Sequence, residues 1–437
     1  MSEAGFVSDV IPSRSMSGAS LPLFDQLTPN VATAPAPPQT VDFLSQVRAF
    51  RDFGQSTAEF EEDGIRYLVN EYWTARQRQA SSLHEVSYRA CFKPQLPEFF
   101  ISRLTEPGEI VHDPFMGRGT TPLQAAIMDR RPSGNDINPL SVLLTRPRFR
   151  PPLLADVARR LNEVPWPAGE IERDDLLAFY HPSTLSKLSG LRKWLLSRCP
   201  IEDPNPDPID DWIRMVSLNR LTGHSPGFFS GRTMPPNQAV SIASQIKMNA
   251  KRGLQPPPRD IVAIILKKSK KLLSDGAPLH QDGMAGALCI GSATSMPTIP
   301  DGSVALTVTS PPFLDIVQYA SDNWLRCWFA GIDIDSVAIA MHRTPEAWTS
   351  MVRDVLIEQS RIMRPGGHVA FEVGEVRGGK ILLERLVWQA VNGLPFERLA
   401  VMVNQQDFTK TANCWGVANN TSGTNTNRIV ILRRHLN

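Results

Sequence analysis

Apolar positions follow two different periods along the chain. In residues 41–86 they recur at the three-to-four spacing of one helix face, and this predicts an N-terminal helical segment. Residues 1–40 are rich in Ser, Ala and Pro with few anchoring aromatic residues, which predicts a disordered tail. The apolar positions behind the helical prediction are Phe43, Val47, Phe50, Phe53, Ile65, Leu68, Val69 and Tyr72.

From Gly108 onward, short apolar runs ending in turns alternate with helical patterns. One clear helical pattern covers residues 345–367 and ends in glycine. Strands that alternate with helices indicate an α/β fold, here a mostly parallel seven-stranded sheet with helices on both faces. The seven predicted strands lie within residues 109–115, 132–140, 286–293, 303–313, 368–376, 397–405 and 427–434.

Residues 147–285 interrupt this alternation with Pro-rich joints and several amphipathic helices, which predicts a mainly helical inserted domain. Its later part carries a run of basic residues with Asp260 as the one acid among them. Such a run predicts a surface that contacts phosphates, and the alternative is a solvated helix face. The basic residues are Lys247, Lys251, Arg252, Lys267, Lys268, Lys270 and Lys271.

Composition limits the class of protein. Hydrophobic residues make up 42% and the formal net charge is +2, so the chain can bury a sizeable core and nothing global demands a polyanionic partner. Its five cysteines and eight histidines form no metal-ligand or disulfide spacing, so we expect no metal and a reducing, cytoplasmic environment. We also expect neither a signal peptide nor a membrane span.

A glycine-containing loop follows the first predicted strand, from Asp113 to Thr121. Gly117 and Gly119 let the backbone approach a ligand closely, and the helix that follows presents its amino terminus to polar groups. Pro122 stands where a dinucleotide-binding loop would have its third glycine. Taken alone, the motif also fits an ordinary strand–helix turn.

Asp136 ends the next predicted strand. A carboxylate at this place in an α/β sheet can accept hydrogen bonds from both hydroxyls of a ribose. The alternative is an aspartate that caps a helix or turn.

Residues 309–313 read Thr-Ser-Pro-Pro-Phe and follow another predicted strand. The two prolines fix the backbone and remove two amide donors. The Ser310 hydroxyl and the Pro311 carbonyl can accept hydrogens from an exocyclic amine, and Phe313 can stack on a base that has left its helix. The alternative is a rigid loop with a core Phe.

These motifs converge through topology. Asp113, Asp136, Ser292 and Ser310 all come at the carboxyl ends of predicted strands. Ligands of open α/β sheets bind outside those ends, where the strand order reverses. We therefore expect one crevice lined by all four.

Together the motifs resemble the DNA amino-methyltransferases, which modify cytosine N4 or adenine N6. The resemblance covers residues 87–146 and 286–437 and implies a Rossmann-like methyltransferase fold. Ser292 stands where many relatives carry Asp. By this resemblance the catalytic residues are Ser310, Pro311, Pro312 and Phe313. The residues it implies for binding S-adenosyl-L-methionine are Phe92, Lys93, Pro94, Asp113, Phe115, Gly117, Gly119, Thr120, Thr121, Asp136 and Ser292.

The resemblance also implies a reaction: methyl transfer to an exocyclic amine of duplex DNA, with base flipping. Serine before Pro-Pro favours cytosine N4, with adenine N6 as the alternative and RNA guanine N2 or protein glutamine as more distant ones. A non-enzymatic nucleic-acid-binding protein is a further alternative. No Pro-Cys pair occurs, which excludes the cytosine-carbon methylases. The 147–285 insertion would be the DNA target-recognition domain, and a cognate restriction endonuclease would be a partner.

Overall fold

The computed structural model describes residues 40–73, 80–88, 91–166, 170–233, 239–275, 287–312, 314, 319–337, 342–376, 381–405 and 426–437. The predicted tail up to residue 39 and the predicted stacking residue Phe313 lie outside these residues.

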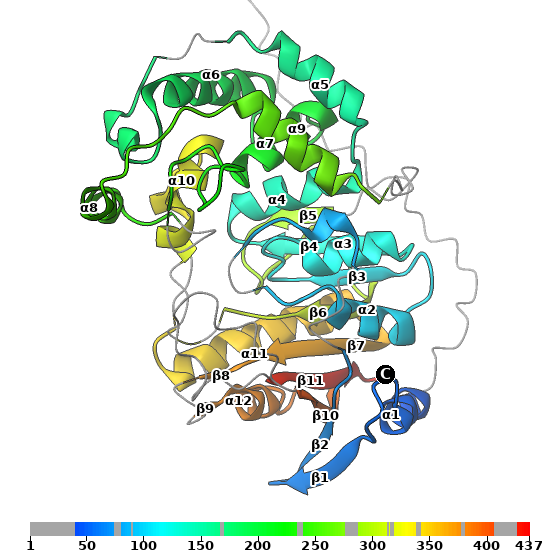
Figure 1. Ribbon diagram of the computed structural model, residues 1–437. Coiled ribbons are helices and arrows are strands. Elements are labelled where there is room, and N and C mark those ends of the chain that lie inside the picture. Colours follow the sequence, from blue (N-terminus) through cyan, green and yellow to red (C-terminus); the bar gives the residue numbers. More distant parts are fainter. Residues whose placement is uncertain are drawn as a thin grey trace, which may run out of the picture. The chain divides into compact units, whose positions relative to one another are not determined.

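Nine strands of the described residues form one sheet, in the order β1-β2-β10-β11-β7-β6-β3-β4-β5 (Figure 1). Strands β3 to β7 pair in parallel, and β11 runs antiparallel to both its neighbours. All seven predicted strands are present, so the mostly parallel α/β sheet is confirmed. They are β3 (Ile110–Asp113), β4 (Arg131–Asp136), β5 (Ala287–Ile290), β6 (Val304–Thr309), β7 (Met363–Val373), β10 (Phe396–Gln405) and β11 (Thr426–Arg434).

The strand order reverses beside β3. The chain runs outward through β3, β4 and β5 and then returns to place β6 on the other side of β3. Helices that follow β3 and β6 therefore leave toward different sides, which opens a crevice at the carboxyl ends of these two strands. Every residue of β6 is buried, as expected for a central strand covered on both faces.

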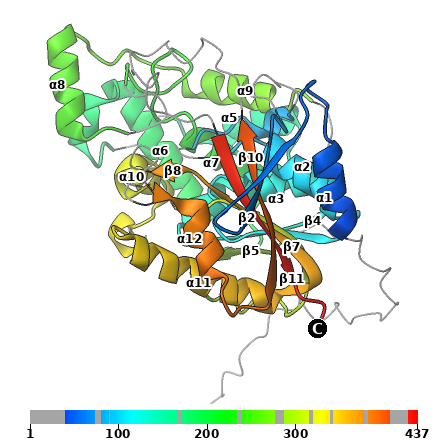
Figure 2. The same cartoon turned by 90° about the horizontal axis from the view of Figure 1, so that it is seen from below.

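Helices cover the two faces of the sheet (Figure 2). On one face α1 (Thr40–Ala49), α2 (Gln95–Leu104) and α3 (Thr120–Ile127) pack with apolar residues of β3, β6 and β11. On the other face α11 (Pro345–Ile362) and α12 (Leu383–Ala390) pack on β6, β7 and β10. The predicted helix at 345–367 is confirmed, although it ends at Ile362 and β7 begins at the next residue.

The predicted N-terminal helical segment is only partly correct. Residues 40–49 do form α1, but β1 (Ala58–Glu62) and β2 (Ile65–Asn70) form a hairpin that pairs in parallel with β10. Asp63 and Gly64 link the hairpin with positive φ angles of 51° and 72°. An Asp-Gly pair is the standard signal for such a two-residue turn, and it outweighs the apparent helical spacing at Ile65 and Leu68.

The insertion is helical, as predicted, and among its described residues the one β contact is an isolated bridge between Gly223 and Arg232. Its apolar side chains join those of α4 and α10 in one core, and residues 39–437 form one compact unit. The insertion therefore has a core built mostly from its own side chains, which it shares with α4 and α10. Its helices are α5 (Leu154–Glu163), α6 (Pro182–Arg198), α7 (Pro208–Leu218), α8 (Ile242–Arg252) and α9 (Ile261–Leu272), with α4 (Pro139–Thr145) and α10 (Tyr319–Ala330) beside them.

The remaining elements are short. None of the helices in the described ranges has the length and apolar character needed to cross a bilayer. The short elements are β8 (Glu375–Val376), β9 (Ile381–Leu382), η1 (Ser82–His84), η2 (Arg146–Phe149), η3 (Asp174–Ala178) and η4 (Ile334–Ser336).

Candidate functional site

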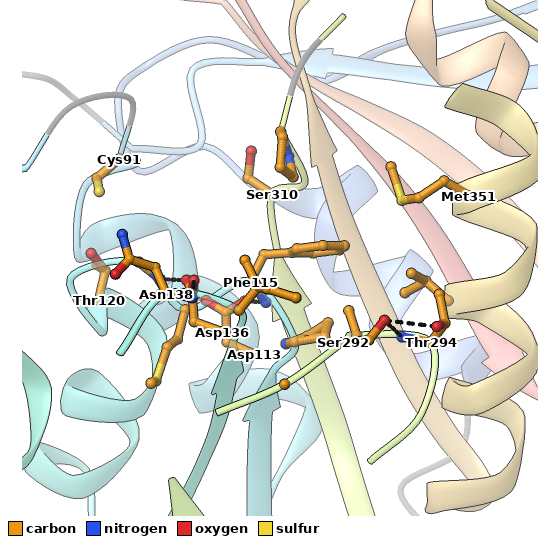
Figure 3. Close-up of a pocket in the computed structure, with 18 of the residues that line it drawn as sticks. Cys91, Asp113, Phe115, Thr120, Asp136, Asn138, Ser292, Thr294, Ser310 and Met351 are labelled. Carbon is orange, nitrogen blue, oxygen red and sulfur yellow. Dashed lines mark hydrogen bonds between the residues drawn. The ribbon is translucent and has the colours of Figure 1, made fainter. Parts of the chain in front are cut away.

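A pocket lies at the carboxyl ends of β3, β4, β5 and β6 (Figure 3). Asp113, Asp136, Ser292 and Ser310, which are far apart in the sequence, all line it. Gly117 lines it too, so the glycine loop and the serine-proline loop border one cavity. The fold thus brings the predicted residues together at the point where the strand order reverses.

The glycine loop depends on left-handed backbone. Gly117 has φ 51° and Gly119 has φ 73°, a region in which residues with a Cβ are strained. A Cβ on Gly119 would also overlap the side chain of Thr145, whereas one on Gly117 would come no closer than 3.6 Å, to Tyr88. Gly119 is the N-cap residue of α3 and does not line the pocket, so its role is to shape the loop.

Asp136 holds the glycine loop against β4. Its Oδ2 accepts a hydrogen bond from the Gly117 amide at 2.8 Å, and its Oδ1 accepts one from the Asn138 amide at 2.9 Å. Burial raises the pKa of this carboxyl, and the two amide donors oppose that shift. An ionised carboxylate has about four acceptor sites, so oxygen lone pairs remain for hydroxyl donors inside the pocket.

Asp113 links the two loops of the pocket. Its Oδ1 accepts hydrogen bonds from the Phe115 amide at 3.0 Å and from the Thr309 hydroxyl at 2.6 Å. Burial raises the pKa of Asp113 to about 7, against the effect of these donors. Thr121 adds a second link, because its hydroxyl donates to the Val308 carbonyl at 2.9 Å.

Ser310 follows β6 and faces the pocket. Its hydroxyl donates a hydrogen bond to the carboxylate of Glu372 on β7, which also accepts one from Asn427 Nδ2 at 2.9 Å. Burial raises the pKa of Glu372, and these two donors oppose the shift. Since the single proton of Ser310 points to Glu372, its lone pairs are available to donors in the pocket. Glu372 was not predicted, because its contact with Ser310 crosses between neighbouring strands.

The proline pair is fixed from α11. Trp348 Nε1 donates to the Pro312 carbonyl at 2.9 Å. Pro312 lines the pocket, while Pro311 is buried and does not. The Pro312 carbonyl is therefore occupied by Trp348.

The segment before α2 forms one wall. Of the three predicted residues Phe92, Lys93 and Pro94, Phe92 alone lines the pocket, because Lys93 is exposed and Pro94 is buried at the start of α2. Tyr88 and Cys91 line the same wall and were not predicted.

Phe115 stands between two halves of the pocket (Figure 3). Cys91, Thr120 and Asp136 lie on one side, and Ser292 and Met351 lie on the other.

The second half contains groups that the sequence analysis missed. Met351 and Val355 come from α11, and His342 comes from the segment before it. The Nε2 atom of His342 is buried and lacks a hydrogen-bond partner among the described residues. Ser292 shares a hydrogen bond of 2.8 Å with Thr294. Two hydroxyls therefore stand at the place where the resemblance led us to compare Ser292 with an Asp. Met351 and Val355 lie on the apolar side of an amphipathic helix pattern, which shows that they face inward. The pattern does not show whether they face a packed core or a pocket, so they were not predicted as site residues.

The predicted basic surface divides into two parts. Lys247, Lys251 and Arg252 are exposed on α8. On α9, Lys268 is buried and donates to the Glu85 carbonyl at 2.7 Å, and Lys271 forms an ion pair of 2.6 Å with the same residue.

Burial and the charge of Arg220 lower the pKa of Lys268 to about 8. Lys267 and Lys270 are exposed on the rest of α9. Lys268 and Lys271 therefore attach the insertion to the segment that leads into the pocket. Their role as phosphate contacts stays a prediction.

The sequence analysis predicted that the chain binds no metal. In the part of the chain that the structure describes, His, Cys, Asp and Glu side chains form no group of three that would hold a metal ion.

Sequence comparison finds similarity in the N-terminal part of the sheet domain. A model of the N6/N4 DNA methylase family matches residues 49–144, which include the glycine loop and Asp136 and end before Ser310. The type II methyltransferase M.MjaII of Methanocaldococcus jannaschii is 36% identical over 75 residues. That match covers 17% of this chain and 14% of the relative.

Solved structures show weak overall similarity. TrmN from Thermus thermophilus has a TM-score of 0.31 and 12% identity, over 79% of this chain and 50% of that one. A SAM-dependent methyltransferase from Methanosarcina mazei has a TM-score of 0.30 and 10% identity, over 77% of this chain and 98% of that one. At such TM-scores we draw nothing from the likeness, and the fold rests on the strand order given above.

Proposed function

We propose that this chain, whose residues 49–144 match the N6/N4 DNA methylase family, transfers a methyl group from S-adenosyl-L-methionine to an exocyclic amine of duplex DNA. The observation that carries the proposal is that Gly117 and Ser310 line one pocket. One loop suits a nucleoside cofactor, and the other offers acceptors to an amine. We favour cytosine N4, on the resemblance of the Ser-Pro-Pro loop, over adenine N6.

The pocket fits this cofactor. Asp136 presents a partly buried carboxylate, fixed by two amides, that suits the hydroxyls of a ribose. Gly117 lacks a Cβ where one would face Tyr88, and this leaves room beside the loop. When bound, the cofactor supplies a methyl group on an electrophilic sulfonium. Phe92, Phe115 and Thr120 would hold it together with Asp136, and Phe115 would offer its ring to the positive charge.

Ser310 and Glu372 would prepare the target amine. The amine lone pair is delocalised into the base, so the nitrogen is a weak nucleophile. Ser310 donates its proton to Glu372 and therefore accepts from the amine, which favours a tetrahedral nitrogen with a localised pair. Pro311, whose carbonyl was the predicted second acceptor, does not line the pocket, so this proposal assigns the acceptor role to Ser310.

A proton must leave during the reaction. The methyl–sulfur bond breaks, a methyl–nitrogen bond forms, and the nitrogen gives up one of its two hydrogens. Ser310 can receive that proton while passing its own to Glu372. The raised pKa of Glu372 makes its carboxylate a better base than an exposed one. Positioning adds much of the rate, since well-oriented reactants gain about 7–11 kcal/mol.

Tritiated-methyl transfer tests the proposal. We expect label in unmethylated duplex DNA and, after digestion to nucleosides, in N4-methylcytosine. Label in N6-methyladenine would replace the favoured base by its alternative. Label confined to RNA or protein would contradict the proposed function. Ser310→Ala is the matched control, and we expect it to bind the cofactor and to transfer at most about 1% of the methyl groups.

A further inference from the structure

Residues 212–259 of the insertion contain seven Lys and Arg residues and no Asp or Glu. Two of the seven are used inside the fold. Arg214 is buried and donates to Asp211 at 2.6 Å, and Arg220 lies 4.2 Å above the ring of Phe228. The other five are Arg232, Lys247, Lys251, Arg252 and Arg259, which we call the α8 basic surface.

Helix α8 packs on the insertion with one side and exposes the other. Gln245 is its one buried residue, and Lys247, Lys251 and Arg252 are exposed along its second half. Ile246, beside Lys247, is 55% exposed. Gln245 Nε2 donates to the Arg232 carbonyl at 3.1 Å, which fixes the helix beside Arg232. A second hydrogen bond, from Asn249 Nδ2 to the Ala178 carbonyl at 2.7 Å, holds the inner side of the helix, so its basic side chains face outward.

A small hollow lies next to the end of α8. Arg232 and Arg259 both line it, together with Asn249 and the backbone around Pro256. The Nε of Arg259 is buried and has no hydrogen-bond partner among the described residues. No carboxylate of the described ranges forms an ion pair with either arginine. Two arginines that line a hollow without an acid suit a phosphate group, because Arg binds phosphate through paired N–H donors.

The same segment is tied to the helix that follows the serine-proline loop. Trp324 Nε1 on α10 donates to the Val240 carbonyl at 3.3 Å, just before α8 begins. Figures 1 and 2 both place α8 on the α10 side of the insertion. A strand of nucleic acid on α8 would therefore lie on the side of the insertion that contacts α10.

We propose that the α8 basic surface binds the sugar-phosphate backbone of duplex DNA, with one phosphate between Arg232 and Arg259. The inference rests on the proposed function for the identity of the polyanion. It assigns no phosphate contact to the lysines of α9, of which Lys268 and Lys271 already contact Glu85. The proposed surface thus covers the first half of the predicted basic run.

Binding of a fluorescent 30-base-pair unmethylated duplex, measured by anisotropy over a range of NaCl concentrations, tests this surface. Each phosphate contact that is lost should reduce the slope of log K against log[salt] by about 0.9. The double variant Arg232→Gln/Arg259→Gln should therefore lose about 0.9 of the slope, because the two arginines share one phosphate. Its affinity at 0.1 M salt should fall by roughly tenfold or more. The triple variant Lys247→Gln/Lys251→Gln/Arg252→Gln should behave in the same direction.

Lys267→Gln/Lys270→Gln on α9 is the matched control, since it also removes exposed positive charge from the insertion. We expect its slope to equal that of the wild type. Cofactor binding by calorimetry should be unchanged in all variants, which verifies that the pocket is folded. Equal slopes for the wild type and both α8 variants would overturn the inference, as would an equal loss in the α9 control.

The two proposals fail separately. If the enzyme methylates DNA and the slopes do not change, the surface is wrong and the proposed function stands. If DNA is not methylated but the α8 variants still lose slope, the surface stands and the proposed function fails. Tighter binding of a single-stranded RNA of the same sequence than of the duplex would overturn the assignment to duplex DNA.

Discussion

The hydroxyl of Thr309 donates a 2.6 Å hydrogen bond to the Oδ1 atom of Asp113. Both residues are buried, and each ends a strand that flanks the reversal of the strand order. The contact joins the loop proposed for the cofactor to the loop proposed for the target amine. A shift of one loop is therefore transmitted directly to the other.

Asp113→Asn should change how stability depends on pH. Burial raises the pKa of Asp113 from 3.8 to about 7 in the folded protein. Between these values the folded state binds more protons than the unfolded state, so this residue makes the wild type less stable as pH rises. The asparagine variant lacks that penalty. Relative to the wild type it should gain up to about 4 kcal/mol between pH 4 and pH 8.

Urea unfolding of both proteins at pH 4, 6 and 8 measures the difference. Comparing the two proteins at each pH cancels the titration of all other groups. A stability difference that is the same at the three pH values would refute the role of Asp113.

The two glycines should respond differently to alanine. Gly119→Ala combines a positive φ with an overlap on Thr145, and we expect a loss of about 2–4 kcal/mol of stability. Gly117→Ala meets ordinary contact distances, so about 1–2 kcal/mol is expected from the backbone alone. Its new methyl group faces Tyr88 in the pocket, so cofactor affinity should fall more than stability does.

Urea denaturation and calorimetric titration with the cofactor separate these effects. The double variant Gly119→Ala/Thr145→Ala should recover part of the lost stability, since the overlapping atoms are those of Thr145. No recovery would show that the overlap is not the cause.

Glu372→Gln should slow methyl transfer by roughly 100-fold without altering cofactor affinity. Burial raises the pKa of Glu372, so its carboxylate takes up a proton at a higher pH than an exposed glutamate. The protonated form no longer accepts the Ser310 proton. In the wild type, kcat should therefore fall as pH decreases through that raised pKa.

Steady-state kinetics from pH 5 to pH 9 test this role. The acid limb should disappear in Glu372→Gln and remain in Ser360→Ala, a hydroxyl deletion on the exposed part of α11. An unchanged acid limb in Glu372→Gln would assign the titration to another group.

Trp348→Phe should disturb the proline loop while keeping an aromatic ring in the core. The variant removes the N–H that binds the Pro312 carbonyl, and leaving that acceptor unpaired costs about 1–3 kcal/mol. We expect lower stability and a lower kcat. Trp388→Phe on α12 is the control, because its ring lies against Arg398 and does not line the pocket. Thermal unfolding and kcat are measured for both, and equal effects would argue against a specific role for Trp348.

Local patterns predicted much of the fold. The seven strands, the helix at 345–362 and the helical insertion follow from apolar periodicity and its breaks. The resemblance to DNA amino-methyltransferases is confirmed by the match at residues 49–144. The hairpin at Asp63 and Gly64 was missed although its turn signal is local, because a helical spacing was counted across the turn.

By itself, the sequence determined which short motifs end the strands: a glycine loop after β3, an acid after β4 and a serine-proline loop after β6. These motifs can be recognised from sequence because residue type limits the backbone: glycine permits positive φ angles, and proline fixes its own φ angle. Tertiary structure decided which side chains share space. It brought Glu372 to Ser310 and His342 into the pocket, and it turned Lys268 toward Glu85 while α8 kept its charges exposed. Such contacts join residues from separate elements, and no local pattern encodes their packing.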